Sequence, residues 1–176
     1  MFKACDRDNA KSAFVHYRRV LLIMSFYMYL SSNDSQTLFA ENRFYDFVVE
    51  LPREYHFGNG RDWCFALIDL YVTRVQESAR GRFETDVKLD KTLAVLCDLA
   101  SSSYIANQEA PVLRLLPAKD EEGSSLYMPH YICVTKSSVN RIRIRLTNED
   151  LKPVTDEDFT DARQLVLRCT LHFCQK

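Results

Sequence analysis

The sequence predicts an all-β protein: an antiparallel β-sandwich, most simply a single jelly roll, preceded by a short N-terminal arm. Three observations support this prediction. Short apolar segments recur between polar turns, several of them alternate with a period of two, and the chain shows no long amphipathic helix and no internal repeat. We expect an N-terminal extension over residues 1–23 and one β-sandwich domain over residues 24–176.

The composition is that of a chain that folds into one packed domain. Of its 176 residues, 47% are hydrophobic and only 4 are Gly and 5 Pro, which excludes the disordered and collagen-like classes. The formal net charge of -1 gives no long-range attraction to nucleic acid or acidic membranes, so we expect no membrane partner and no specific nucleic acid. Six irregularly spaced cysteines indicate reduced, mostly buried thiols.

Residues 1 to about 19 are polar and basic, and we interpret the first 23 residues as an extension outside the core. Residues 10–19 have the pattern of a short helix with a small apolar face. The apolar run 20–30 follows two arginines and superficially resembles a signal peptide. It is too short to span a bilayer, its second half is aromatic, and no small-residue cleavage site follows it. A first core strand explains it as well.

The first half of the domain contains three expected strands. Residues 26–30 form the first. In residues 45–51 alternate side chains share one apolar face, and Pro52 is expected to end that strand. Residues 63–72 are apolar on both faces, which indicates a central strand covered on two sides, although periodicity alone does not exclude a buried helix. Trp63, the only tryptophan, is interpreted as a core anchor.

The second half supplies the clearest strand patterns. In residues 140–146, Arg141, Arg143 and Arg145 alternate strictly with aliphatic residues. In residues 165–173, the alternation places Cys169 inward and His172 outward. The other expected strands are 83–89, 92–99, 111–116 and 131–135, and 119–125 is the clearest exposed loop.

No motif for catalysis or cofactor binding is present, so we expect a structural or binding protein rather than an enzyme, with no cofactor. The four glycines cannot form a phosphate-binding loop, and no nucleophile elbow is present. Cys169, His172 and Cys174 lie close in sequence, but on a strand the first two point to opposite faces, so we expect no metal site. His56 and His130 lie near expected strand ends and are given no role. An enzyme with an unfamiliar site is the third alternative, which the sparse histidines disfavour.

Arg141, Arg143 and Arg145 are the best candidates for a functional surface. Side chains on one face of a strand repeat about every 7 Å, so three guanidinium groups in a row could hold carboxylates or phosphates. The more common alternative is a solvated strand face paired with Asp or Glu across the sheet. The more specific alternative is a contact of the three arginines with a neighbouring subunit or with packaged nucleic acid.

Several segments resemble the small single jelly-roll proteins of Polinton (Maverick) elements, adintoviruses and adomaviruses, which are penton-like or minor capsid proteins. The resemblance spans roughly residues 24–174 and consists of hydrophobic strand patterns. They are Phe26-Tyr-Met-Tyr-Leu-Ser-Ser-Asn-Asp-Ser35, Phe47-Val-Val-Glu-Leu-Pro52, Trp63-Cys-Phe-Ala-Leu-Ile-Asp-Leu70, Pro111-Val-Leu-Arg-Leu-Leu116 and Cys169-Thr-Leu-His-Phe173.

The resemblance implies a structural capsid protein: a penton-like vertex or minor subunit of a viral or virus-derived particle. Such a protein associates with itself as a pentamer, abuts a larger major capsid protein, is assembled inside the host cell and resides in the virion. The small size leaves little room for an outer receptor-binding domain. The alternative is a ligand-binding β-sandwich module, lectin-like or cytokine-like, that uses exposed Tyr and Arg residues for recognition.

Overall fold

The computed structural model describes residues 24–58, 62–78, 81–87, 91–105, 107–117, 128–159 and 162–176. Within these ranges the chain forms eleven strands and two short 3₁₀ turns, and the strands make two main antiparallel sheets. The all-β sandwich expected from the sequence is therefore confirmed. The expected N-terminal extension, including the short helix over 10–19, and the expected loop 119–125 lie outside the described residues.

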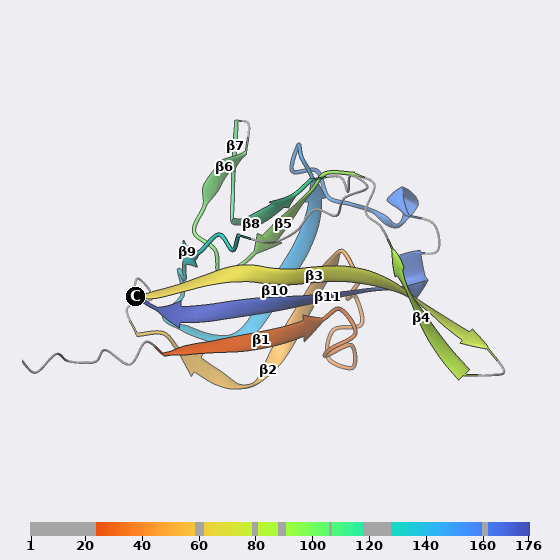
Figure 1. Ribbon diagram of the computed structural model, residues 1–176, viewed down its shortest axis with the longest axis horizontal. Helices are drawn as coiled ribbons and strands as arrows, with labels where there is room; N and C mark the ends of the chain where they lie inside the picture. The colour runs from red at the N-terminus through yellow and green to blue at the C-terminus, as the bar shows by residue number, and fades with distance from the viewer. Residues whose placement is uncertain are drawn as a thin grey trace, which may run out of the picture.

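The two sheets are packed face to face, and their strands cross one another (Figure 1). Sheet A has the order β1-β11-β3-β4, with β9 also paired to β3, and sheet B has the order β2-β10-β5-β8. Sheet A comprises β1 (Ser25–Ser31), β3 (Trp63–Ser78), β4 (Gly81–Val87), β9 (Ile132–Cys133) and β11 (Leu165–Gln175). Sheet B comprises β2 (Asp46–His56), β5 (Leu93–Cys97), β8 (Val112–Leu116) and β10 (Ser138–Asn148). A small hairpin, β6 (Ser103–Ile105) and β7 (Gln108–Ala110), and the turns η1 (Asp156–Asp158) and η2 (Ala162–Gln164) complete the described elements.

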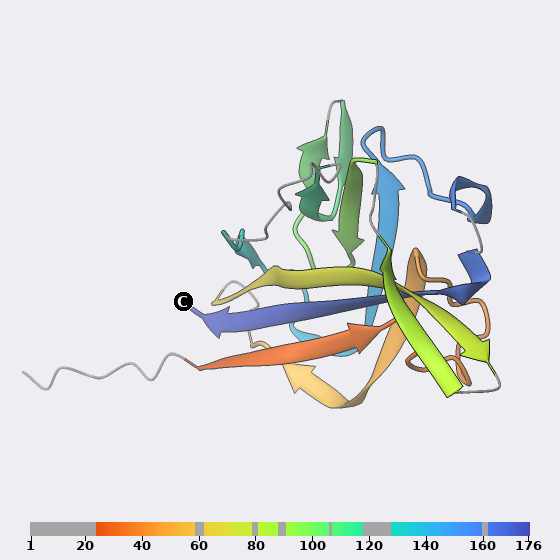
Figure 2. The same ribbon diagram turned by 45° about the vertical axis from the view of Figure 1, so that its right-hand side comes forward.

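The strand pairing is nested, as in a jelly roll. The first strand pairs with the last (β1 with β11), then β2 with β10, β3 with β9, and β5 with β8. These eight strands give the two-sheet arrangement of a single jelly roll, as the sequence predicts. Strand β4 and the β6–β7 hairpin are additions, and Figure 2 shows both projecting away from the sandwich.

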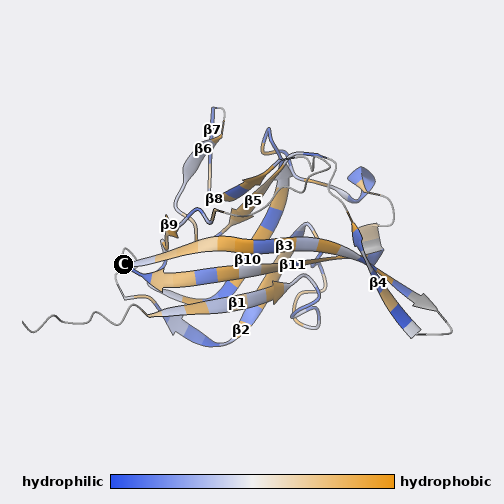
Figure 3. Cartoon of the chain, in the orientation of Figure 1, coloured by the Kyte–Doolittle hydropathy of each residue, from blue (hydrophilic) through white to orange (hydrophobic). Residues whose placement is uncertain are grey.

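The core lies between the inner faces of the two sheets, and its aromatic centre is on β11. Phe173 is fully buried and stacks on Phe26, Phe57 and Phe65, with ring centroids 4.9, 5.4 and 5.3 Å away. Trp63 is buried beside the same group, which confirms its expected place as a core anchor. Apolar residues alternate with polar ones along β10 and β11, and Figure 3 shows this alternation as changing colour along the strands.

Two details of the sequence prediction are wrong. Pro52 does not end its strand, because β2 continues to His56. The ladder with β10 is irregular there: Glu50 pairs with Arg141 and Tyr55 with Val139, so Pro52 lies in a stretch with no ladder partner at the edge of sheet B. A proline in such a place breaks no ladder hydrogen bond.

The second error is the hairpin β6–β7, since no strand is expected between the predicted strands 92–99 and 111–116. Its strands have three residues each, and most of their side chains are exposed, so no hydrophobic period marks them. The segment 63–72, by contrast, is a strand and not a helix, and four successive residues from Cys64 to Leu67 are buried, as expected for a strand covered on both faces.

Candidate assembly surfaces

The arginine strip, Arg141, Arg143 and Arg145, lies on the outer face of sheet B. Arg143 donates two hydrogen bonds to the carboxylate of Asp46 on β2, at 2.8 and 2.7 Å, and these bonds raise the pKa of Arg143. Arg141 lies 3.6 Å from the carboxylate of Glu50 and over the ring of Phe39, 5.3 Å from its centroid. Two of the three guanidinium groups are therefore neutralised by their own sheet.

Arg145 differs from its two neighbours in the arginine strip. It is half-buried and lines a groove of about 290 Å³ together with Tyr45, Gln108 and Pro111. The structure thus keeps the three arginines in one row but does not make them one anion-binding clamp. A contact with a neighbouring subunit or nucleic acid through this strip stays a prediction.

The outer face of sheet A carries exposed tyrosines on β1, on β3 and next to β9. We call Tyr27 and Tyr29 of β1, Tyr71 of β3 and Tyr131, next to β9, the tyrosine face. Their exposed fractions are 54, 77, 42 and 41%. In β1, Met28 points inward, so the strand alternation places both neighbouring tyrosines outward.

His172 on β11 holds two of these tyrosines in place. The Tyr131 hydroxyl lies 2.6 Å from His172 Nδ1, and the ring of Tyr27 stacks on the imidazole with centroids 4.5 Å apart. Burial, followed by the nearby Cys174 and Tyr27, raises the pKa of Tyr131, so its hydroxyl stays protonated and can donate to Nδ1. The aromatic groups are therefore ordered before any partner arrives.

The free edges of β1 and β2 differ in whether side chains hydrogen-bond to their backbone groups. Along β2, Asn42 mimics a neighbouring strand, since its amide accepts from the Val48 N–H at 2.9 Å and donates to the Val48 carbonyl at 2.9 Å. Ser35 Oγ accepts from the Glu50 N–H at 3.0 Å. These side chains protect the β2 edge from pairing with another strand.

Strand β1 is an edge strand that has no second strand partner among the described residues. The Gln175 N–H donates to the Met24 carbonyl, and bonded pairs alternate along the ladder, so Phe26 and Met28 are the bonded residues opposite β11. The N–H and C=O groups of Tyr27 and Tyr29 consequently point away from β11. The open edge and the most exposed tyrosines thus coincide.

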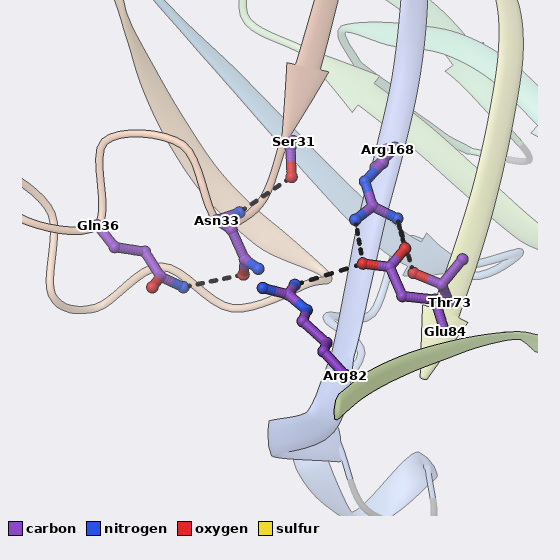
Figure 4. A network of polar contacts seen from close by, with 7 residues as sticks. All are labelled: Ser31, Asn33, Gln36, Thr73, Arg82, Glu84 and Arg168. Atoms are coloured by element: carbon purple, nitrogen blue, oxygen red, sulfur yellow. Dashed lines mark hydrogen bonds and ion pairs between the residues drawn. The ribbon is translucent and has the colours of Figure 1, made fainter. Parts of the chain in front are cut away.

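A polar network ties the hairpin formed by β3 and β4 to β11. Figure 4 shows Arg168 of β11 reaching Glu84 of β4 and Thr73 of β3. The two Arg168–Glu84 hydrogen bonds are 2.8 and 2.9 Å long, and Arg82 lies 3.4 Å from the same carboxylate. The hydrogen bonds from Arg168 hold the pKa of Glu84 below its usual value. The β3–β4 hairpin is therefore held against β11 by a bidentate ion pair to the middle of β4.

In the loop that follows β1, Figure 4 shows a separate set of hydrogen bonds. The Asn33 N–H donates to Ser31 Oγ at 3.3 Å, and the Gln36 amide donates to Asn33 Oδ1 at 3.1 Å. Near this loop, a groove of about 330 Å³ runs between β1 and β2, with Tyr29, Asp34, Glu50 and Tyr55 in its lining.

No site role is expected for Cys169, His172, His56 or His130. Cys169 is buried in the core while His172 is on the outer face, so they do not converge. His56 is exposed and lies 3.8 Å from Glu54, and His130 is exposed next to β9. In the described part of the chain, no group of three or more His, Cys, Asp or Glu is arranged to hold a metal ion.

Sequence reasoning missed the tyrosine face. Residues 26–30 are all apolar or aromatic, so the outward positions of β1 do not stand out, and the phenol hydroxyl is their one polar group.

No helix of the described residues is long and apolar enough to cross a membrane. No protein-family model matches the chain, and no curated protein matches it in sequence.

Proposed function

We propose that the chain is a structural capsid protein, a penton-like vertex or minor subunit of a viral or virus-derived particle that assembles through β1. The observation that carries the proposal is the coincidence, on one jelly-roll strand, of an open backbone edge and the two most exposed residues of the tyrosine face. The fold alone would not carry it, because jelly rolls also serve as lectins and enzymes.

An open strand edge with exposed aromatic rings favours burial against another protein. Unpaired N–H and C=O groups of an edge strand are a template for pairing with another chain, and tyrosine is enriched in protein interfaces. The formal net charge of -1 means that copies of the chain do not repel each other strongly. The proposed partner at β1 is therefore a second copy of the chain.

A ring follows if β1 meets a different surface of the neighbouring copy. Such a head-to-tail contact closes into a ring when the rotation between copies allows it, and a pentamer is the ring that fits a vertex. The opposite outer face, with Arg145 and its groove, would then be available to a major capsid protein. In this proposal the protein acts in the virion, is assembled inside the host cell and uses no cofactor.

The test is the mass of the purified chain in solution, measured by native mass spectrometry and light scattering over a range of concentrations. The proposal expects a pentamer, or another closed ring that forms reversibly. Tyr29→Ser should shift the equilibrium toward the monomer by about tenfold or more, because tyrosine is enriched among central interface residues whose truncation costs about 2 kcal/mol or more.

Tyr104→Ser is the matched control, because Tyr104 is 76% exposed but lies on the β6–β7 hairpin. It should leave the association unchanged, and both variants should keep the melting temperature of the monomer. A strict monomer at every concentration would refute self-assembly through β1. Equal effects of the two substitutions would show that the association is unspecific.

A second candidate is a ligand-binding β-sandwich, which the groove between β1 and β2 favours. Its volume of about 330 Å³ is at the lower end of the range for small-molecule sites, and Tyr29, Tyr55, Asp34 and Glu50 offer aromatic and carboxylate groups for a sugar. A glycan array with the monomeric protein tests it, and binding that Tyr55→Ala abolishes would favour this function over the capsid role.

A further inference from the structure

Three cysteines from three strands meet on the outer face of sheet A. Cys64 of β3 lies opposite Cys174 of β11 on one side and opposite Cys133 of β9 on the other. Directly opposed residues of an antiparallel ladder project to the same face, so the three thiols form a row with Cys64 in the middle. We call Cys64, Cys133 and Cys174 the thiol row. Cys64 is buried, and the other two are half-buried.

The backbone distinguishes the two pairs of the thiol row. The Val134 N–H donates to the Trp63 carbonyl at 3.0 Å, so the next pair, Cys64 with Cys133, is not hydrogen-bonded. In such a pair the Cα atoms are about 4.5 Å apart and the side chains lie closest. That separation lies within the range of about 4.4–6.8 Å over which a disulfide can form.

The geometry of the Cys64–Cys174 pair is less favourable for a disulfide. The Lys176 N–H donates to the Asp62 carbonyl at 2.8 Å, which makes Cys64 and Cys174 a hydrogen-bonded pair. The Cα atoms of such a pair are about 5.5 Å apart, and their side chains lie farther from each other. Cys64 should therefore combine with Cys133 before it combines with Cys174.

A cation lies beside the outer end of the row. Lys176 Nζ donates to the Cys133 sulfur at 3.0 Å. This hydrogen bond raises the pKa of Lys176, so its ammonium persists at neutral pH. A positive charge at this distance favours the thiolate, which is the reactive form of cysteine. Burial raises the pKa of Cys64 above its usual value, so Cys64 is a thiol at neutral pH.

The remaining described cysteines have no such environment. Cys97 and Cys169 are buried in the core, and burial raises the pKa of Cys97 well above its usual range and that of Cys169 to about 12. Thiols in that setting are inert. They are therefore internal controls for any reaction of the thiol row.

We propose that the thiol row is a modification site for small disulfides such as oxidised glutathione, with Cys133 as the attacking residue and Cys64 as the resolving residue. The Cys133 thiolate forms a bond to one sulfur of the small disulfide, whose own bond breaks, and one half leaves and takes up a proton. Cys64 then loses its proton, bonds to the Cys133 sulfur and releases the second half as a thiol. The protein loses two electrons to the small disulfide, and β3 and β9 become covalently joined.

This site is independent of the proposed capsid role, and it is tested on the full chain with oxidised glutathione. Cys5, which lies outside the described residues, is replaced by Ser so that it does not react. Mass spectrometry of the folded protein should show the loss of two hydrogens, and peptide mapping should show a Cys64–Cys133 bond. No reaction, or a bond between Cys64 and Cys174, would overturn the proposal.

Single substitutions separate the roles. Cys64→Ala should stop the reaction at a stable glutathione adduct on Cys133, whereas Cys133→Ala should leave the row without an adduct. Cys174→Ala is the matched control and should form the same disulfide as the parent chain. An unmodified Cys64→Ala protein would refute the role of Cys133, and melting curves show that each variant is folded.

The rate of adduct formation and its pH profile test whether Lys176 activates Cys133. Lys176→Gln should lower the rate of adduct formation by about threefold or more and shift its pH profile upward, because the thiolate then forms at higher pH. Lys152→Gln removes the same charge from an exposed lysine that pairs with Asp150 and should leave the rate unchanged. Equal rates in the two variants would show that Lys176 does not activate Cys133.

Discussion

The outer faces of the two sheets differ in how far their side chains and their edge strands are satisfied by contacts within the protein. On sheet B, the charges of Arg141 and Arg143 are compensated by carboxylates of the adjacent strand, and the edge of β2 is protected by Asn42. On sheet A, the tyrosine face is exposed and the edge of β1 is open among the described residues. A satisfied face suits contact with solvent, whereas an open aromatic face suits a partner. The contrast therefore indicates which side of the sandwich to test for assembly.

The largest expected effect separates the two faces of a single strand of sheet A. Phe173→Ala removes a fully buried ring that stacks on three others, and it should lower the free energy of unfolding by about 3–5 kcal/mol. His172→Ala, one residue away on the outer face, should lower it by about 1 kcal/mol or less. Urea unfolding of both variants measures the difference.

If the two substitutions had similar costs, the assignment of inner and outer faces along β11 would be wrong. A large cost of His172→Ala alone would mean that the Tyr27–His172–Tyr131 contacts are part of the folded core, and the tyrosine face would then be a structural feature of the monomer.

An intermediate effect is expected from the ion pairs of sheet B. Asp46→Asn leaves the Arg143 guanidinium without its bidentate partner and should lower the free energy of unfolding by about 0.5–1 kcal/mol, the usual value for a partly exposed pair. Asp150→Asn, whose carboxylate lies 3.8 Å from exposed Lys152, is the control and should have almost no effect.

Thermal unfolding at low and at molar salt measures this second prediction. The gap between the two variants should shrink at high salt, because salt screens charges near the surface. Equal melting temperatures at low salt would mean that sheet B does not depend on its ion pairs, and the contrast between the two outer faces would then lie in the aromatic side chains alone.

The sequence was sufficient to predict the sandwich because the strands that build it carry clear patterns. In β10 and β11, aliphatic or aromatic side chains alternate with polar ones, and the spacing of apolar segments predicts the jelly roll that the nested pairing confirms. The strand β1 has no such alternation, since Phe26 to Leu30 are all apolar or aromatic. Its outward tyrosines could be recognised only once β11 fixed which face is inside.

The sites depend on contacts between residues far apart in the sequence, and no local pattern encodes these. Asp46 and Arg143 are 97 residues apart, and which carboxylate meets which arginine follows from the register of β2 on β10. The thiol row likewise exists only because β9 and β11 flank β3 at Cys64. From six irregularly spaced cysteines the sequence predicts mostly buried thiols, which fits Cys64, Cys97 and Cys169, whereas Cys133 and Cys174 of the row are half-buried.

The smallest expected effect on stability comes from Glu84, whose carboxylate joins the β3–β4 hairpin to Arg168 of β11. The pKa of Glu84 is lower in the folded protein than its ordinary value of 4.5, chiefly because of the hydrogen bonds from Arg168. The stabilisation is therefore complete above pH 4.5 and is lost as the pH falls through the folded pKa. Below pH 4.5, the melting temperature of the parent chain should consequently fall more steeply than that of Glu84→Gln.

Glu54→Gln is the control, because Glu54 is an exposed carboxylate of β2 that lies 3.8 Å from His56. It should leave the steepness of the acid limb unchanged, whereas Glu84→Gln should flatten it. Some acid sensitivity should remain in both variants, because the hydrogen bonds from Thr155 also lower the pKa of Asp158. If the acid limb of Glu84→Gln were as steep as that of the parent, the Arg168–Glu84 ion pair would not be what holds the β3–β4 hairpin against β11. The order of side chains on the outer face of sheet A would then depend on the contacts of the tyrosine face alone.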